Sequence, residues 1–519
     1  MKKYLIPLCM IVLLLPPPLH AKWISAYDIE QSENDKVVSL VQTADTGFIV
    51  LNNDMTLLKL SPAGSIAWTV NYLRGYGNAP RQIIETADLG YLLLANHRTS
   101  GSDNCTANDK IWLIKLDQNG QILWQRVYYG IDTQIDSVTV REIPVNNGYI
   151  VAGNIKNSDI DTDIWVLRLS PAGIVSWQKT LSINGQLQAF DMLYDQTNTR
   201  IVVSGTLYLS GSINYFGMIF SLDMNGTLDW ARRYSLATYF SSMIQEGTSY
   251  LAAGTNTDFE NNRNALLAKI NAMDGSIIWG KKYGSPYGQE QIEQLVAADG
   301  GGYAFICNTN LYGMGSYDVW LNKVDHSGNV TWGRTFGGID AESGTALYKT
   351  ADSGYITGGF TQSFPLNTPF MNLLLIKLPS DGCYDNCTRL ETTAIPGTDI
   401  TGHTYNLPLS EDLISPVKTL DTHVSPDNGS SINRYNICQS LDSDGDGIPD
   451  DGDNSGIAGD NPCPHGVTVN CDDNCIYDCN VFQLNHDDFA DDIGDVCDRD
   501  PNCDRGCGAN PCEQKCSLP

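Results

Sequence analysis

The sequence is poor in positive charge and in long apolar runs. It has 32 Lys and Arg against 60 Asp and Glu among 519 residues, a formal net charge of −28 at pH 7. A chain this acidic repels phosphate backbones, so we expect no nucleic-acid partner. Beyond residue 21 no apolar run is long enough to span a bilayer, so we expect no transmembrane segment and a soluble mature protein.

Recognisable catalytic spacings are also lacking. The seven His are scattered without metal or triad spacing, no two Cys are adjacent, and no Cys-x2-Cys-His motif occurs. Covalent haem is therefore not indicated. No segment before residue 383 has a convincing helical period, which excludes the helical fold classes for that region.

The first 21 residues have the composition of a cleaved signal peptide. Lys2 and Lys3 precede an apolar run from Tyr4 to Leu15, and a Pro-rich stretch ends at Ala21. This predicts a secreted protein, extracellular or at the cell surface, with the periplasm as an alternative. A lipid anchor at Cys9 is the less favoured interpretation, because the apolar run continues past it.

Tryptophan recurs at near-constant spacing. The repeating residues are Trp23, Trp68, Trp124, Trp177, Trp230, Trp279 and Trp332. Each one except Trp23 ends a phrase of apolar strand, Gly turn and three residues, as in Ile270 to Trp279. A strand-rich repeat of about 50 residues is typical of a β-propeller blade.

The first and last copies of this repeat are incomplete, and each supplies the half that the other lacks. Trp23 has no strand phrase before it, and Gly382, after the strand Ile376 to Leu378, has no Trp behind it. An N-terminal strand that completes the last blade would hide the sheet edges of an open array. The sequence thus predicts an all-β fold: a seven-bladed β-propeller over 22–383, closed by the N-terminal strand.

The blade phrase resembles the tryptophan-docking motif of the quinoprotein-like β-propellers. In that family the Gly permits the turn and the Trp packs between adjacent blades, so the resemblance implies a structural role. Quinone-dependent dehydrogenases of the family have eight blades and an adjacent-Cys disulfide, and this chain matches neither feature. Trp112, Trp165 and Trp320 occupy one repeat position, which favours packing over a cofactor floor. A sialidase-type Asp box is broken by longer spacing around Gly120.

The last 81 residues are densely acidic. Residues 439–519 hold 18 Asp and one Glu against two Arg and one Lys. Carboxylates stand at positions one, three, five, nine and twelve of an EF-hand-like loop, with Gly at six and a backbone carbonyl at seven. The predicted ligands are Asp442, Asp444, Asp446, Ile448, Asp450 and Asp453. Asp at the twelfth position, in place of Glu, shortens the bidentate reach.

Residues 442–498 as a whole resemble a thrombospondin type 3 repeat, in which the chain wraps a row of calcium ions and is pinned by disulfides. This resemblance implies further calcium ligands at Asp473, Asn474, Asn485, Asp487, Asp491, Asp495 and Asp498. Two extra residues between Asp487 and Asp491, and Asp492 in place of Gly, depart from the family pattern.

Cysteine is concentrated in the same part of the chain. Of 15 Cys, 12 fall between Cys383 and Cys516, several as Cys-x3-Cys pairs. In an exported, acidic segment with little core this predicts disulfides, with zinc or iron–sulfur ligation as the alternative. Cys105 and Cys307 lie four blades apart and are expected to remain free thiols.

These observations predict five regions. They are a signal peptide at 1–21, the propeller at 22–383, a connector with one or two strands at 384–438, thrombospondin type 3-like repeats at 439–498 and a Cys-rich tail at 499–519. The expected function is a monomeric, calcium-binding adhesion or scaffold module for an extracellular protein or glycan, not an enzyme. The alternative is an exported propeller enzyme, quinone-dependent or glycan-active, with its active site in the central funnel.

Overall fold

The computed structural model describes two parts of the chain. The first part comprises residues 22–29, 34–72, 78–98, 109–129, 134–145, 147–158, 160–212, 214–258, 261–284, 287–313, 316–364 and 370–382, and the second 390–392, 398–400, 403–406, 410–412, 418–420 and 433–436. All regular elements in these ranges are β-strands. Within them no helix is long and apolar enough to cross a membrane.

The strands form antiparallel sheets in which neighbours in sequence are neighbours in space. Four sheets contain β2(Val37–Gln42), β3(Phe48–Asn52), β4(Thr56–Leu60) and β5(Ile66–Asn71); β6(Ala79–Glu85), β7(Tyr91–Arg98), β8(Asp109–Leu116) and β9(Ile122–Tyr129); β18(Tyr239–Glu246), β19(Ser249–Thr257), β20(Arg263–Asn271) and β21(Ile277–Tyr283); and β22(Gln291–Ala297), β23(Tyr303–Thr309), β24(Asp318–Val324) and β25(Val330–Phe336). Period-2 apolar runs with Gly and Asn/Asp turns account for this pattern.

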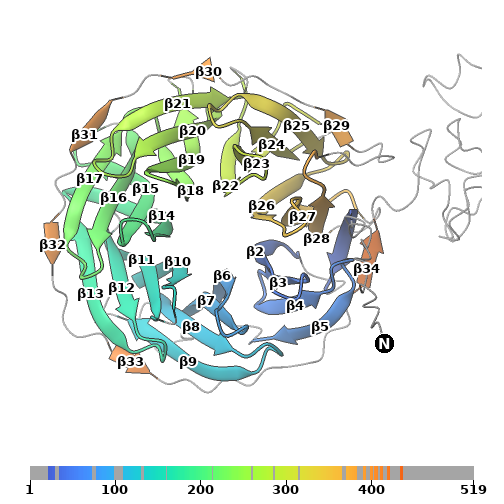
Figure 1. The fold of residues 1–519 in the computed structure, drawn as a ribbon, viewed down its shortest axis with the longest axis horizontal. Coiled ribbons are helices and arrows are strands. Elements are labelled where there is room, and N and C mark those ends of the chain that lie inside the picture. Colours follow the sequence, from blue (N-terminus) through green and yellow to red (C-terminus); the bar gives the residue numbers. More distant parts are fainter. Residues whose placement is uncertain are drawn as a thin grey trace, which may run out of the picture.

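Eight more strands lie in one larger sheet. They are β10(Gln134–Glu142), β11(Tyr149–Ser158), β12(Asp161–Leu169) and β13(Val175–Ser182), followed by β14(Gly185–Asp195), β15(Arg200–Leu209), β16(Tyr215–Asp223) and β17(Leu228–Tyr234). Pairing inside each set of four is antiparallel, and one parallel pair, Thr162 with Gln186, joins the two sets. Figure 1 shows all these sheets arranged as a ring, with the first strand of each set innermost, which is the β-propeller architecture that the sequence predicted.

The N-terminal strand closes this ring. β1(Trp23–Asp28) pairs antiparallel with β28(Asn372–Leu378), in the sheet of β26(Glu342–Lys349) and β27(Tyr355–Thr361). Trp23 lies opposite Lys377, and Tyr27 lies opposite Leu373. The predicted pairing of the two ends of the repeat is therefore confirmed.

The recurring Trp residues lie against the next sheet along the chain. Gly275 has a φ of +72°, and a Cβ added there would lie 2.7 Å from the Trp230 ring. The Trp230 indole N–H also donates a 3.2 Å hydrogen bond to the carbonyl of Ala272. Only Gly combines this left-handed backbone with so close an approach. Each Trp ring thus fixes the spacing between adjacent sheets.

Other large aromatic side chains fill the space between neighbouring sheets. Trp112, Trp165 and Trp320 are at most 1% exposed and pack in three separate apolar clusters between neighbouring sheets. Their burial agrees with the packing role predicted from their shared repeat position.

Six short strands form a belt around the ring, where one or two strands were expected. They are β29(Leu390–Thr392), β30(Thr398–Asp399), β31(Thr404–Asn406), β32(Ser410–Asp412), β33(Lys418–Leu420) and β34(Asn433–Asn436). These strands pair in turn with β25, β21, β17, β13, β9 and β1. The belt runs backwards along the outer edge (Figure 1) and ends on the N-terminal strand. Its segments are too short and too polar for the apolar periodicity that marks a strand in sequence.

Candidate functional site

The innermost strands share a β-bulge at one position. In β2, β6, β10, β14, β18, β22 and β26, one residue is skipped in the pairing with the following strand. We call these the bulge residues: Val38, Arg81, Val138, Phe190, Ser241, Glu293 and Thr345. A bulge bends its strand and re-aims a side chain, and bulges are frequent beside binding sites. The bulge residues differ in chemistry although their position is the same.

Three bulge residues line one pocket. The cavity has a volume of about 370 Å³ and is bounded by strands β6, β10, β11, β12 and β14. Its lining is formed by Arg81, Gln134, Asp136, Ser137, Val138, Asn154, Lys156, Thr162, Gln188, Ala189 and Phe190. Arg81 and Phe190 are the two bulge residues whose side chains are exposed. The pocket therefore lies where the bulge positions offer accessible side chains.

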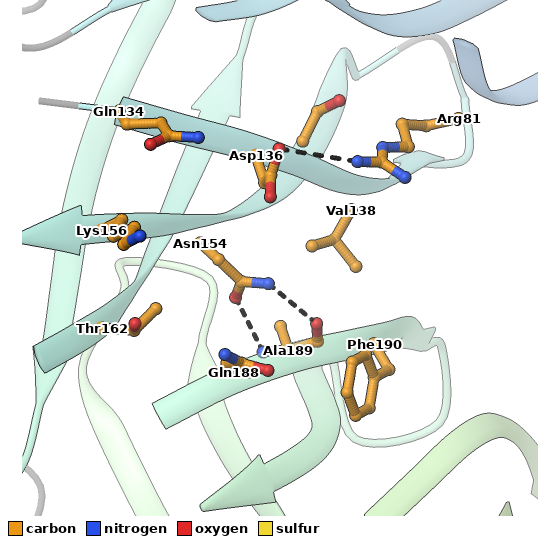
Figure 2. Close-up of a pocket in the computed structure, with 11 residues that line it drawn as sticks. Arg81, Gln134, Asp136, Val138, Asn154, Lys156, Thr162, Gln188, Ala189 and Phe190 are labelled. Carbon is orange, nitrogen blue, oxygen red and sulfur yellow. Dashed lines mark hydrogen bonds and ion pairs between the residues drawn. The ribbon is translucent and has the colours of Figure 1, made fainter. Parts of the chain in front are cut away.

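A charged pair forms one wall of the pocket. Figure 2 shows Arg81 and Asp136 facing each other, with 3.5 Å between Nη2 of Arg81 and Oδ1 of Asp136. Both side chains are about half exposed, so this ion pair contributes little to stability. Asn96 holds Asp136 from behind by donating a 2.7 Å hydrogen bond to the same oxygen. The carboxylate is thus oriented by a buried amide while it stays accessible to solvent.

The opposite wall is tied to the bulge of β14. The backbone N–H of Ala189 donates to Asn154 Oδ1 at 2.8 Å, and Asn154 Nδ2 donates to the Ala189 carbonyl at 3.2 Å (Figure 2). This two-way bond fixes the residue next to Phe190. The Phe190 ring contacts the Tyr239 ring edge-on, with 5.5 Å between centroids, and remains 39% exposed.

Asp191 anchors the same bulge from the buried side. Its carboxylate accepts a 2.6 Å ion pair from Arg141 and a 2.8 Å hydrogen bond from the backbone N–H of Met243. Burial raises the pKa of Asp191, and Arg141 with the backbone donors opposes that effect. Because Arg141 and Met243 belong to the preceding and following sets of strands, Asp191 links three sets beneath the pocket.

Equivalent side chains make the same link elsewhere in the ring. Gln82 accepts the backbone N–H of Val140 at 2.7 Å, and Gln294 accepts that of Leu347 at 2.9 Å. Ser242 receives the N–H of Leu295 at 3.2 Å. Backbone donors on the innermost strands are thus satisfied by neighbouring sheets, which holds the bulges rigidly in place.

Glu293 is the bulge residue with an acidic side chain. Burial raises the pKa of its carboxyl, and Gln291 and Asn308 donate to its Oε1 at 2.5 and 3.4 Å. A buried acid can act in proton transfer. Asn308 also bonds both backbone polar groups of Gly344 in the next sheet, at 2.8 and 3.2 Å. Through Asn308, Glu293 therefore belongs to the hydrogen bonds that join two neighbouring sheets.

The predicted calcium ligands lie outside the residues that the structure describes. They are Asp442, Asp444, Asp446, Ile448, Asp450, Asp453, Asp473, Asn474, Asn485, Asp487, Asp491, Asp495 and Asp498. The signal peptide at 1–21, the Cys-rich tail, the Cys pairs from Cys383 onwards and Cys105 also lie outside them. Within the described ranges, no group of three or more His, Cys, Asp or Glu could hold a metal ion. Cys307 is described there as a buried free thiol, and burial raises its pKa well above the ordinary value.

The pocket residues were not predicted from the sequence. A usable signal was present, because the aligned repeats place unlike residues such as Arg81 and Phe190 at one strand position. Until the strand pairing is known, this variation looks the same as the ordinary sequence variation of surface residues. The bulge gives it a structural meaning.

Comparison with known proteins gives structural similarity alone. No family model and no curated protein matches the sequence. Among solved structures, the chain is similar to BamB from Moraxella catarrhalis, with 12% identity over 66% of this chain and 85% of the other, at a TM-score of 0.34. It is similar to the C-terminal WD40 domain of Sif2, with 10% identity over 67% and 98% and a TM-score of 0.40. It is also similar to quinohemoprotein alcohol dehydrogenase from Comamonas testosteroni, with 10% identity over 70% and 78% and a TM-score of 0.42.

Proposed function

We propose that this protein is a secreted or cell-surface binding module whose ligand site is the pocket between Arg81 and Phe190. The observation that carries this proposal is a polar pocket built at the bulges of the innermost strands and held by bonds between sheets. Ligand sites combine a preformed hollow with a few fixed polar groups. The bulges of this ring supply both.

The ring in this proposal has seven blades. Six are β2–β5, β6–β9, β10–β13, β14–β17, β18–β21 and β22–β25, and the seventh joins β1 to β26–β28. The larger sheet, which contains β10–β17 and the belt strands β31 and β32, then counts as two blades, because the link between its two sets of four is one parallel residue pair. The two sets are otherwise equivalent to the separate four-stranded sheets.

The acidic region is the calcium-loaded part of this module. It follows β34, which pairs with the N-terminal strand, so it is attached to the same sheet that closes the ring. Calcium bound at Asp442 to Asp453 and at the downstream Asp and Asn residues would neutralise the self-repulsion of a segment with 18 Asp. Disulfides would supply further covalent stabilisation in an oxidising compartment.

An exported enzyme with an active site in the central channel is the competing function. The raised pKa of Glu293 is the observation that favours it, since an acid of this kind could transfer a proton. Against it, the Glu293 oxygen is held by the amides of Gln291 and Asn308, and Asn308 also bonds the backbone of Gly344 in the next sheet. The binding function therefore explains more of the observed contacts.

Native mass spectrometry of the exported protein, with and without a calcium chelator, tests this proposal. We expect several calcium ions that the chelator removes, and no bound quinone. A co-purifying quinone, or a mass without calcium, would contradict it. Loss of hydrolytic activity in Glu293→Gln, with an unchanged melting temperature, would favour the enzyme.

A further inference from the structure

The pocket combines planar amides with an accessible aromatic ring. Gln134 and Gln188 line it, and their side chains make no hydrogen bond within the described part of the chain. Each amide offers two N–H donors and one carbonyl acceptor. Phe190 contributes an apolar ring face that is partly exposed. A ligand for this lining needs alternating donors and acceptors beside an apolar surface.

The charges of the pocket suit a ligand without strong net charge. Arg81 and Asp136 form an ion pair, so their charges largely cancel as seen by a bound molecule. Lys156, which is exposed near the end of β11, leaves one positive charge on the lining. The remaining donor and acceptor positions of Arg81 and Asp136 still face the cavity (Figure 2). The same two groups can therefore hydrogen-bond to neutral hydroxyls from both sides.

Three exposed aromatic side chains lie at the same end of the ring, on different sets of strands. We call this end the entry face; it carries the loops between β11 and β12, β15 and β16, β21 and β22, and β23 and β24. Tyr215, Tyr287 and Tyr317 lie there and are 49%, 78% and 40% exposed, together with the exposed aliphatic residues Ile160, Leu311 and Ile339. On the opposite face, the strongly exposed large apolar residues of the connecting turns are aliphatic, as at Val145 and Ile174. Gln134 begins β10 and Lys156 lies near the end of β11, so the pocket belongs to the entry face.

An extended peptide fits this site less well. Peptides that add to a sheet need unpaired backbone groups at a strand edge. On the innermost strands these groups are already engaged, since Gln82 takes the N–H of Val140 and Asp191 takes that of Met243. A peptide would have to break bonds that hold the blades together.

We propose that the pocket binds a neutral oligosaccharide. The Phe190 ring packs against the apolar C–H face of one sugar ring, while Gln134, Gln188 and the Arg81–Asp136 pair hydrogen-bond to its hydroxyls. Tyr215, on the β14–β17 set that borders the pocket, extends the contact to a neighbouring sugar unit. This inference rests on the proposed binding function and specifies its ligand class.

The test is calorimetric titration of the full-length, calcium-loaded protein with cellohexaose, xylohexaose, mannohexaose and chitohexaose. We expect at least one hexasaccharide to bind. Phe190→Ala should weaken that binding about tenfold or more, because it removes the stacking surface, whereas Phe190→Tyr should preserve it. Gln188→Ala should also weaken it, and supplies the test if Phe190→Ala does not fold. Met273→Ala, which changes an exposed side chain in a turn of the opposite face, is the matched control.

The outcomes separate the ligand class from the site. Absence of binding by all four sugars, or equal binding by wild type and Phe190→Ala, overturns the oligosaccharide proposal. The same variants are then applied to an immobilised peptide array. Peptide binding that depends on Phe190 would keep the pocket as the binding site but replace the ligand class. If neither ligand class binds in a Phe190-dependent way, both the ligand class and the pocket assignment fail.

Discussion

The phenol of Tyr27 donates a 2.7 Å hydrogen bond to the carbonyl oxygen of Gly64, and this bond is buried. Tyr27 lies on β1, in the sheet of β26–β28, whereas Gly64 lies in the turn between β4 and β5. The same Tyr-to-Gly bond joins other adjacent sheets, as from Tyr128 to Gly173 at 2.6 Å. The joint between the first and last sheets is therefore built like the joints inside the ring.

This equivalence predicts equal effects of removing either hydroxyl. Tyr27→Phe leaves the buried Gly64 carbonyl without its donor, which should cost about 1–3 kcal/mol of unfolding free energy. Tyr128→Phe is the matched control within the ring and should cost a similar amount. Urea unfolding should show one transition shifted in both variants. A shift in Tyr128→Phe with none in Tyr27→Phe would contradict closure by β1.

The belt predicts a difference between two truncated chains. A chain ending after residue 436 keeps β29–β34, whereas a chain ending after Gly382 loses the strands that pair with six outer edges. We expect the shorter chain to melt several degrees lower, since those backbone groups lose their partners, and to aggregate more readily at its exposed edges. Equal melting temperatures, measured by scanning calorimetry, would show that the belt adds no stability.

Asp35 predicts a fall in stability as pH rises. It is 1% exposed and accepts hydrogen bonds from the Ile29 N–H at 2.9 Å and from Asn52 at 3.3 Å. Burial, with the carboxylates of Asp54 and Asp28 nearby, raises the pKa of Asp35 to about 7. In the unfolded chain an Asp ionises near pH 4, so its stabilising contribution is complete below that pH and is lost as pH rises through 7.

The variant Asp35→Asn cannot ionise and should remove this part of the pH dependence. Unfolding free energies at pH 5 and pH 7.5 should differ less in the variant than in the wild type. An unchanged difference between the two pH values would show that Asp35 is already ionised in the folded protein at pH 5.

The calcium assignment predicts the loss of one ion from a double variant. Asp444→Ala with Asp446→Ala removes two carboxylates from positions three and five of the loop, so one calcium ion should disappear in native mass spectrometry. Asp451→Ala with Asp460→Ala is the matched control, because it removes equal charge outside the predicted ligand set. Propeller melting should be the same in both variants. An unaltered ion count in the first variant would contradict the site.

Sequence periodicity was sufficient to predict the ring but not its pocket. The Trp230 and Gly275 positions fall in fixed phrases because each joint between sheets needs a flat ring against a residue without Cβ. Phe190 belongs to no such repeated phrase. Its exposure depends on a bulge in β14, which is held by Asn154 on β11 and by the bonds of Asp191 to Arg141 on β10 and Met243 on β18. Bonds between residues far apart in sequence leave no periodic pattern.

The sequence by itself determined the all-β class, the order of the strands, the joints at each Trp and the pairing of the two ends of the repeat. These features follow from local rules, since alternating burial and turn glycines act within a few residues. The tertiary structure alone decided the common bulge of the innermost strands, the pocket between Arg81 and Phe190, and the backward path of the belt. Each of these depends on which backbone groups remain unpaired after the sheets have assembled, and that is known only once the whole ring is in place.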